Sequence, residues 1–332
     1  MTMNVFYGHS NVPPGYGPSV VGVGNFDGVH CGHRAILGRL IAEARAAGMR
    51  AVAITFDPHP LQLLRPDECP PMITPLPERL ALLAETGLDA TLVIPFTPEF
   101  SRRSAHDFAE TILARTLGAK SVHEGDNFRF GYQAQAGIEE LRRLGQELGF
   151  HVVAHSVLHR RNLVVSSSQV RELIARGAVS HARALLGRPF SILSTPAHGR
   201  GIGTKLLVPT INLAPYSELK PAHGVYVTRL QVGEGPMPRS FAAVTNAGNR
   251  PTFGENSYAI ESYLLDYDPE RLPLELTPET RLELSFLTRL RAERRFDSPA
   301  ALKLQIEQDV ARACRYHALA VALAGTQVEA AR

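Results

Sequence analysis

The segment Val21–His33, VGVGNFDGVHCGH, contains the features that decide the fold of the first half of the chain. Residues 20–23 are apolar or glycine, which predicts a buried strand ending at Gly24. A helical pattern, RAILGRLIAEARAAG, begins directly after His33. We therefore expect a strand, a tight turn and the N-terminus of a helix, with polar side chains gathered in the turn.

The turn carries two histidines that suit phosphate chemistry. His30 and His33 are three positions apart, so a helical turn stacks them on one face. A helix N-terminus offers unpaired N–H groups to an anion, imidazoles add donors, and Gly32 permits close approach to the backbone. Asn25 and Asp27 are equally typical of an ordinary turn. The HxGH quartet alone therefore leaves open a surface loop with two solvated histidines.

Composition narrows the class of protein. A chain of 332 residues, 44% apolar and 20% charged, predicts two globular domains. A net charge of +3 does not indicate a nucleic-acid or membrane surface, and we expect partners to be small molecules. Three scattered cysteines argue against a disulfide framework or a CxxC metal site. Without a leader pattern or a membrane-spanning apolar run, we expect a cytoplasmic protein, and its oligomeric state stays open.

Strand and helix patterns alternate in the first half of the chain. Residues 51–56, 90–96, 120–125 and 151–158 continue the strand series, and helices are expected at 75–87, 107–118 and 137–148. Ser104 and Asp107 form a capping-box pattern before the second of these helices. Five strands separated by helices predict a parallel sheet covered on both faces, an α/β domain.

Polar clusters follow three of these strands. HCGH, FDPHP and GDNFRFG each come at the carboxyl end of a strand, where ligands bind in such sheets. Further on, Ser166, Ser167 and Ser168 can cap a helix that carries Arg171. An ordinary capped surface helix is the alternative for this segment.

The second half has short apolar segments separated by Gly, Pro and Asn, which predicts an antiparallel sheet or small closed barrel. A final helix is expected over residues 298–324, with Leu302, Ile306, Val310 and Leu319 at helical intervals and packed across the barrel. The GRPFS segment at 187–191 is the expected junction. We predict domains at 1–186 and 187–332.

Three features of the second half could carry chemistry. Gly199, Gly201 and Gly203 allow a loop to wrap phosphates, although glycine clusters also occur in hairpin turns. Thr210 and Asn212 are two apart on a predicted strand, so both oxygen-bearing side chains share a face that suits Mg²⁺. Glu261 stands in an otherwise apolar strand, where a carboxylate is paired, functional or on the solvent face.

These motifs together resemble the bacterial bifunctional riboflavin kinase and FAD synthetase family. GNFDGVHCGH, TFDPHP, GDNFRFG, SSSQVR, LLGRPF and PTIN occur in the order of that family over nearly the whole chain. The resemblance implies a nucleotidyltransferase-type first domain that transfers AMP from ATP to FMN, and a riboflavin kinase-like barrel with a C-terminal helix. It also implies ATP, riboflavin, FMN and FAD as substrates or products, with Mg²⁺ as cofactor.

The resemblance also assigns roles to individual residues. His30 and His33 match the HxGH signature that binds ATP phosphates, with Gly24, Phe26, Asp27 and Gly32 beside it. Ser166, Ser167, Ser168 and Arg171 match the signature that holds the departing pyrophosphate, and Asp57 and Asn127 match flavin-pocket positions. In the second domain, Glu261 matches the general base, Thr210 and Asn212 match the metal-binding PTxN motif, and Gly199, Gly201 and Gly203 match the ATP loop.

Two segments depart from the family pattern. Leu206, Leu207 and Val208 replace the usual Leu-Gly-Phe before PTxN, and PLELT replaces the usual Leu-Tyr-Gly. Because both lie in the kinase half, a flavin-binding regulatory protein with a decayed kinase site stays open as an alternative. A nucleotidyltransferase for another substrate shares the HxGH motif and is a second alternative, although the barrel-like second half argues against it.

Overall fold

The computed structural model describes residues 2–197, 210–234, 238–250, 257–268 and 273–330. Its contacts divide the chain into two compact units, Met1–Val170 and Arg171–Arg332. This division falls before the predicted boundary at 186/187, because helix α8 (Val179–Leu186) packs on strands of the second unit. The predicted division of activities at 186/187 stays a prediction.

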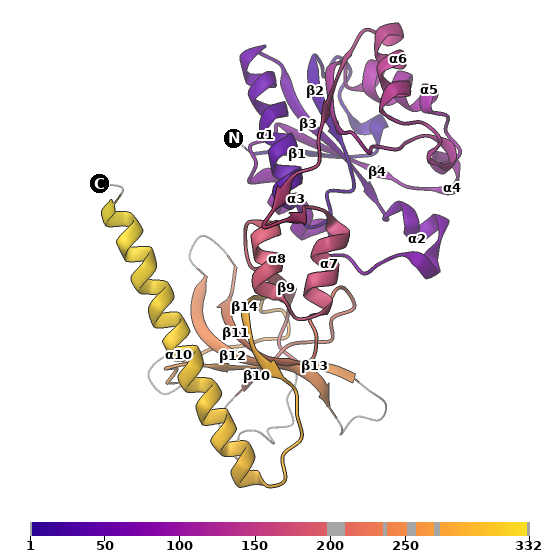
Figure 1. Cartoon of the computed structure of the whole chain (residues 1–332). Coiled ribbons are helices and arrows are strands. Elements are labelled where there is room, and N and C mark those ends of the chain that lie inside the picture. Colours follow the sequence, from indigo (N-terminus) through magenta and orange to yellow (C-terminus); the bar gives the residue numbers. More distant parts are fainter. Residues whose placement is uncertain (1, 198–209, 235–237, 251–256, 269–272, 331–332) are drawn as a thin grey trace. The chain divides into compact units, whose positions relative to one another are not determined.

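The first unit is built on a six-stranded parallel sheet, which confirms the predicted α/β architecture (Figure 1). Its strands are β1 (Asn4–Tyr7), β2 (Ser19–Val23), β3 (Arg50–Asp57), β4 (Ala90–Pro95), β5 (Ala119–Gly125) and β6 (His151–His155). They pair in the order β1-β4-β3-β2-β5-β6. The edge strand β1 is additional to the five predicted strands. Its four residues are too short for a clear periodic pattern, and pairing with β4 stabilises it.

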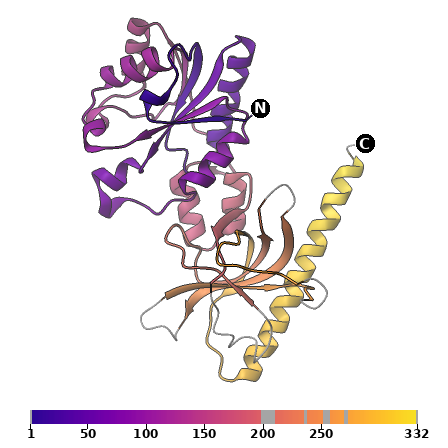
Figure 2. The same ribbon diagram turned by 180° about the vertical axis from the view of Figure 1, so that it is seen from behind.

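Helices cover both faces of this sheet (Figure 2). They are α1 (Cys31–Ala46), α2 (Pro60–Leu64), α3 (Leu76–Ala84), α4 (Pro98–Ser101), α5 (Ala105–Phe108), the π-helical η3 (Ala109–Thr116) and α6 (Ile138–Leu148). Three 3₁₀ turns, η1 (His9–Asn11), η2 (Pro66–Glu68) and η4 (Tyr132–Ala134), and a hairpin of β7 (His159–Arg160) with β8 (Leu163–Val164) complete the unit.

Strands β2 and β3 each contribute to two hydrophobic cores, because side chains alternate between the faces of the sheet. Val21 and Val52 pack in the core under η3 and α6, whereas Val20 and Ala51 pack in the core with Leu37 of α1. The sheet is therefore buried on both sides, and a ligand can meet polar side chains at the strand ends.

The second unit contains a six-stranded antiparallel sheet in the order β10-β13-β12-β11-β14-β9. The strands are β9 (Phe190–Ser194), β10 (Thr210–Asn212), β11 (Gly224–Val232), β12 (Arg239–Arg250), β13 (Ser257–Leu264) and β14 (Leu282–Ala292). A bridge between Pro196 and Leu213 joins the chain after β9 to the end of β10, so the two edges of the sheet meet. This closure confirms the predicted small barrel.

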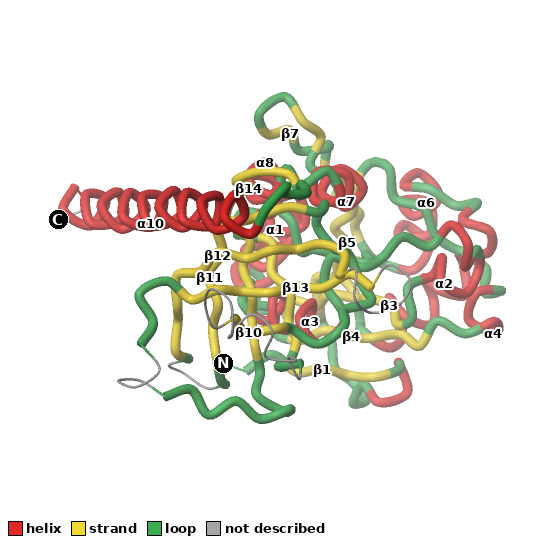
Figure 3. The backbone as a smooth tube through the Cα atoms, turned by 90° about the horizontal axis from the view of Figure 1, so that it is seen from below, coloured by secondary structure: helices red, strands yellow, loops and turns green. Residues whose placement is uncertain are grey.

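Helices α7 (Ser167–Ala175), α8 and α10 (Pro299–Ala330) complete the described elements; α10 is the long helix in Figure 3. Val310 and Ala313 of α10 pack against β11 and β12, which confirms the predicted C-terminal helix. Leu319 does not pack as predicted: its side chain is 65% exposed because the helix continues past the sheet. No helix among the described residues is long and apolar enough to span a membrane.

Candidate active sites

The turn between β2 and α1 places the two predicted histidines face to face. His30 is the N-cap of α1, and its Nδ1 accepts a hydrogen bond from the His33 backbone N–H at 3.2 Å. The two rings stack with centroids 3.6 Å apart and an interplanar angle of 14°. A Cβ at Gly32 would lie 3.1 Å from the His30 ring, so glycine keeps the rings and the helix N-terminus accessible together.

Asp27 fixes the shape of the turn between β2 and α1 through hydrogen bonds to a distant segment of the chain. Its carboxylate is fully buried and accepts hydrogen bonds from the backbone N–H groups of Ile73 at 3.0 Å and Thr74 at 2.9 Å. These bonds hold two residues in the left-handed region, Phe26 (φ 49°) and Val29 (φ 36°). Each non-glycine residue in this left-handed conformation costs about 1–3 kcal/mol of folding free energy. Such residues are found mainly at active sites and ligand-binding sites.

A cavity of about 450 Å³ opens beside the stacked histidines. Among the predicted residues, its wall includes Gly24, Phe26, His30, Gly32, His33, Asn127, Ser166 and Ser167. Segments far apart in the sequence therefore meet in one cavity, as the strand-end argument predicted. Ser166 also caps α7 by accepting from the Gln169 N–H at 3.2 Å, and Ser167 donates to the Asp27 carbonyl at 2.9 Å.

Other predicted residues of the first site do not line this cavity. Asp57 is exposed at the end of β3, and Asp27 lies behind the turn. Ser168 lies in the first turn of α7, and Arg171 is the first residue of the second unit. The roles assigned to these four residues stay predictions.

The electrostatics of the cavity favour uncharged side chains in the absence of ligand. Burial, with the neighbouring His30, holds the pKa of His33 well below its ordinary value of 6.5. The His33 Nδ1 is buried and has no hydrogen-bond partner among the described residues. Burial raises the pKa of Glu124 well above its ordinary value, although the Val23 N–H donates to its carboxyl group. An orphaned ring nitrogen beside a helix N-terminus is typical of a site that a polar ligand completes.

The sequence patterns did not predict that Arg39, His123, Glu124 and His155 also line this cavity. The available signal was the pair of titratable residues within the predicted strand KSVHEG. Such a pair in a strand buried on both faces must be hydrogen-bonded or functional.

In the second unit, strand register brings the predicted kinase residues together. Glu261 of β13 pairs directly with Asn212 of β10 and with Asn246 of β12. Directly opposed residues share a face of a sheet with Cβ atoms about 4.5–5.5 Å apart. Thr210, two residues before Asn212, lies on the same face and pairs with Tyr263.

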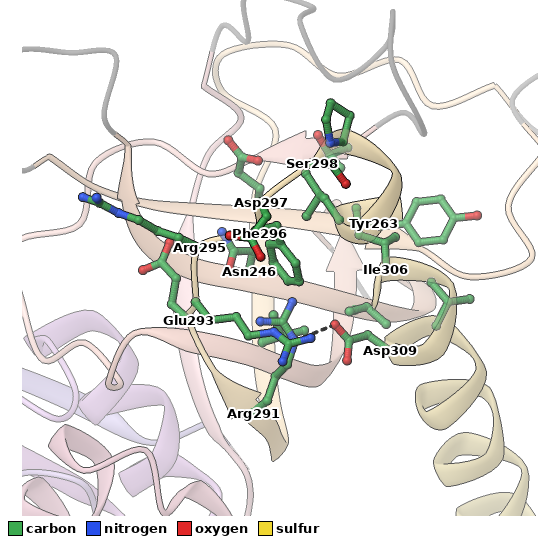
Figure 4. A pocket seen from close by; sticks show the side chains of 18 residues that line it. Asn246, Tyr263, Arg291, Glu293, Arg295, Phe296, Asp297, Ser298, Ile306 and Asp309 are labelled. Carbon is green, nitrogen blue, oxygen red and sulfur yellow. Dashed lines mark hydrogen bonds and ion pairs between the residues drawn. The ribbon is translucent and has the colours of Figure 1, made fainter. Parts of the chain in front are cut away.

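This face opens into a cavity of about 830 Å³ between the sheet and the start of α10 (Figure 4). Thr210 and Glu261 line it, together with Asn246, Tyr263 and Arg291. Asn212 is not among its lining residues. Gly199, Gly201 and Gly203, and the departure at Leu206–Val208, lie outside the described residues.

A buried ion pair holds the wall of this cavity, and the sequence patterns did not predict it. Arg291 Nε donates to Asp309 Oδ2 at 2.8 Å, and Asp309 is only 2% exposed. Gln305 Nε2 donates to the other oxygen of Asp309 at 3.0 Å. The pair joins β14 to α10 and so anchors both ends of the connecting segment, whose Phe296 also lines the cavity (Figure 4).

The two units define an enzyme with a nucleotidyltransferase-type parallel-sheet domain and a separate barrel domain, each with its own cavity. Residues 14–169 match the family described as FAD synthetase, and residues 186–317 match the family described as riboflavin kinase. The chain belongs to the bifunctional riboflavin kinase/FMN adenylyltransferase family.

Individual relatives support this assignment. The bifunctional riboflavin kinase/FMN adenylyltransferase of Escherichia coli K12 is 34% identical over 87% of this chain and 90% of its own length. The enzyme of that name from Pseudomonas fluorescens is 34% identical over 94% of this chain and 97% of its own length. A solved structure titled macrolide-efflux protein from Streptococcus pneumoniae aligns with a TM-score of 0.81 at 24% identity, over 93% of this chain and 97% of that one. At that identity the likeness concerns the fold alone.

Proposed function

We propose that this protein phosphorylates riboflavin to FMN in the second unit and adenylylates FMN to FAD in the first. The stacked pair His30 and His33 at the N-terminus of α1, inside a cavity that Ser166 and Ser167 also line, carries the proposal for adenylylation. Strand pairing of Glu261 with Asn212 supports the kinase assignment. Three cysteines without disulfides agree with a cytoplasmic enzyme.

In the adenylyltransferase reaction, a phosphate oxygen of FMN attacks the α-phosphorus of ATP, and the bond to the departing pyrophosphate breaks. The N–H groups at the start of α1 and the ring of His33 stabilise the negative charge of the transferring group. Because the pKa of His33 is lowered, it acts as a neutral donor. Ser166, Ser167, Ser168 and Arg171 hold the pyrophosphate, and Asp57 and Asn127 serve the flavin. The reaction needs alignment and charge stabilisation, without a covalent nucleophile.

In the kinase reaction, the 5′-hydroxyl oxygen of riboflavin attacks the γ-phosphorus of ATP, and the bond between this phosphorus and ADP breaks. Glu261 accepts the proton that the hydroxyl group loses. Thr210 and Asn212 supply hard oxygen donors that fit Mg²⁺, which neutralises phosphate charge when bound. No group of three His, Cys, Asp or Glu side chains able to hold a metal occurs in the described part of the chain. The ion would therefore share its ligands between these side chains and the ATP phosphates.

The test is product analysis by chromatography after incubation of the full chain with riboflavin, Mg²⁺ and ATP. We expect FMN to appear first and FAD to follow with release of pyrophosphate. Supplying FMN directly separates the two activities. FMN without any FAD would overturn the adenylylation proposal, and conversion of FMN to FAD without phosphorylation of riboflavin would overturn the kinase proposal.

A further inference from the structure

A chain of hydrogen bonds links α1 to two strands of the first unit through buried histidines. Arg39 Nη1 bonds His155 Nδ1 at 3.0 Å, His155 Nε2 bonds His123 Nδ1 at 3.0 Å, and His123 Nε2 bonds Glu43 Oε2 at 2.8 Å. Arg39 and Glu43 lie one turn apart on α1, so the chain begins and ends on the same helix.

The direction of every bond in this chain follows from its two ends. A guanidinium only donates and a carboxylate only accepts, so His155 accepts from Arg39 at Nδ1 and donates at Nε2, and His123 does the same. Each imidazole is therefore neutral and held in one tautomer. Protonation of either ring at Nδ1 would turn the acceptor into a donor and break the hydrogen bond made there. The chain of bonds therefore holds the Arg39 guanidinium in one position.

Burial reinforces the same arrangement. His123 and His155 are 3% and 6% exposed, so both rings are largely shielded from solvent. Burial, with the nearby His123 and Arg39, lowers the pKa of His155. Burial opposes ionisation of Glu43, but the nearby Ser121 hydroxyl and the hydrogen bond from His123 outweigh it and lower the pKa of that carboxyl group.

Arg39 stands at the end of the cavity away from the predicted phosphate site. Gly32, Ile36 and Arg39 all line the cavity and lie along one side of α1. Seven residues at 1.5 Å each place Arg39 about 10 Å along the helix from Gly32. A ligand with its phosphates at the helix N-terminus would thus present a different chemical group to Arg39.

The apolar part of the cavity wall identifies that group, and Val157 in this wall follows His155, the hydrogen-bond partner of Arg39, by two residues. Val157 and Val164, which also line the cavity, are 39% and 42% exposed in the ligand-free structure. A phosphate gains nothing from an apolar wall, whereas a flat nucleobase buries such side chains and interacts favourably with a guanidinium through its π-system. The apolar wall and the cation together fit a purine ring.

We propose that Arg39 contacts the adenine base of ATP in this cavity, and that His155, His123 and Glu43 are positioning residues that hold its guanidinium there. The inference rests on the proposed adenylylation of FMN. It adds a binding residue that lies outside the HxGH and serine motifs.

The experiment compares Arg39→Met with Arg45→Met in the full chain. Arg45 lies on the same helix, where it pairs with Asp89 and is absent from the cavity wall. We expect Arg39→Met to raise the KM for ATP in FAD formation about five- to twentyfold, with little change in kcat. Inhibition of FAD formation by inorganic tripolyphosphate, which has no base, should be unchanged. Arg45→Met should match the parent in both measurements.

Two outcomes would overturn the assignment of Arg39. One is a parental KM for ATP in Arg39→Met; the other is an equal loss of tripolyphosphate inhibition, which would make Arg39 a phosphate ligand. Denaturant unfolding of the same samples, compared with the parent, reports whether the first unit is folded. A parent protein that makes no FAD at all contradicts the proposed function instead.

The positioning role is tested at His123. His123→Val removes the acceptor for His155, whereas His123→Asn keeps an amide oxygen near the place of Nδ1. We expect His123→Val to raise the KM for ATP severalfold without changing tripolyphosphate inhibition, and His123→Asn to restore part of the loss. Parental ATP affinity in a folded His123→Val protein would show that the chain of bonds does not position Arg39.

Discussion

Glu261 of β13 is the direct antiparallel partner of Asn212 of β10. The register places a carboxylate beside an amide on the cavity face, with Asn246 of β12 opposite on the other side. A carboxylate flanked by polar side chains at the wall of a cavity is placed to accept a proton from a bound hydroxyl group. This strand pairing is the basis for the first prediction.

Glu261→Gln keeps the shape of the side chain and removes the proton acceptor. We expect riboflavin phosphorylation to slow by about 10²-fold or more, while FMN adenylylation stays near the parent rate. Initial rates of both reactions on one preparation test this. Glu283→Gln, a matched change on β14 outside the cavity, should be silent. A kinase rate within a few-fold of the parent would make Glu261 a structural residue.

His33→Ala removes a neutral donor from the N-terminus of α1. We expect FAD formation to fall on the order of 10²- to 10³-fold, while FMN formation continues. Because the lowered pKa of His33 makes the neutral ring the active form, His33→Asn should retain more activity than His33→Ala. Equal activity of the two variants would show that hydrogen-bond donation by the ring is not what the reaction uses.

The lowered pKa of His155 links stability of the first unit to pH. As pH falls, His155 takes up a proton near pH 6.5 in the unfolded state and only at a lower pH in the folded state. Stability from this group is therefore present above pH 6.5 and lost as pH falls through the folded-state pKa. We expect the free energy of unfolding, measured with denaturant at pH 7 and pH 5, to fall less between these two pH values in His155→Asn than in the parent. His106→Asn, at an exposed site on α5, should keep the parent's loss.

Glu124 should give the opposite pH dependence. Burial raises its pKa, so as pH rises the carboxyl group loses its proton at a lower pH in the unfolded state than in the folded state. The free energy of unfolding therefore falls as pH rises above about 4.5. Glu124→Gln keeps the acceptor for the Val23 N–H without the charge. We expect it to stabilise the protein at pH 8, by on the order of 1 kcal/mol for each unit of raised pKa, and by less at pH 5. Equal stabilisation at both pH values would contradict the raised pKa.

The second unit should work without the first. We predict that a fragment of residues 187–332 phosphorylates riboflavin and does not adenylylate FMN. Leu185 and Leu186 of α8 are fully buried or nearly so, and α8 packs on β14 and β9. A fragment of residues 171–332 should therefore resist denaturant better, because each exposed leucine costs roughly 1.5–3 kcal/mol. Folded fragments that cannot bind riboflavin would contradict this division of labour.

Several elements of the fold could be predicted because their signals are local. The alternation of apolar strands and amphipathic helices indicated the parallel sheet, and the Gly- and Pro-bounded strands indicated the barrel. Ser104 does accept from the Asp107 N–H at 3.0 Å, as its capping pattern predicted. The spacing of His30 and His33 predicted that the two rings share one face, and they do stack, with His30 as the N-cap that accepts from the His33 N–H.

Contacts between distant segments were decided by the tertiary structure alone. His123 and His155 are bonded because β5 pairs with β6, and Asn246 lies opposite Glu261 because of strand register. Neither pairing leaves a periodic signal in the sequence, since the partners stand on different strands and a periodic pattern describes one element at a time. Leu319 lies at a helical interval from the other apolar residues of α10, yet it is exposed because α10 extends beyond the sheet. Amino-acid pattern determines which face of an element is apolar, whereas only packing determines how far that face is covered and which polar groups meet at its edge.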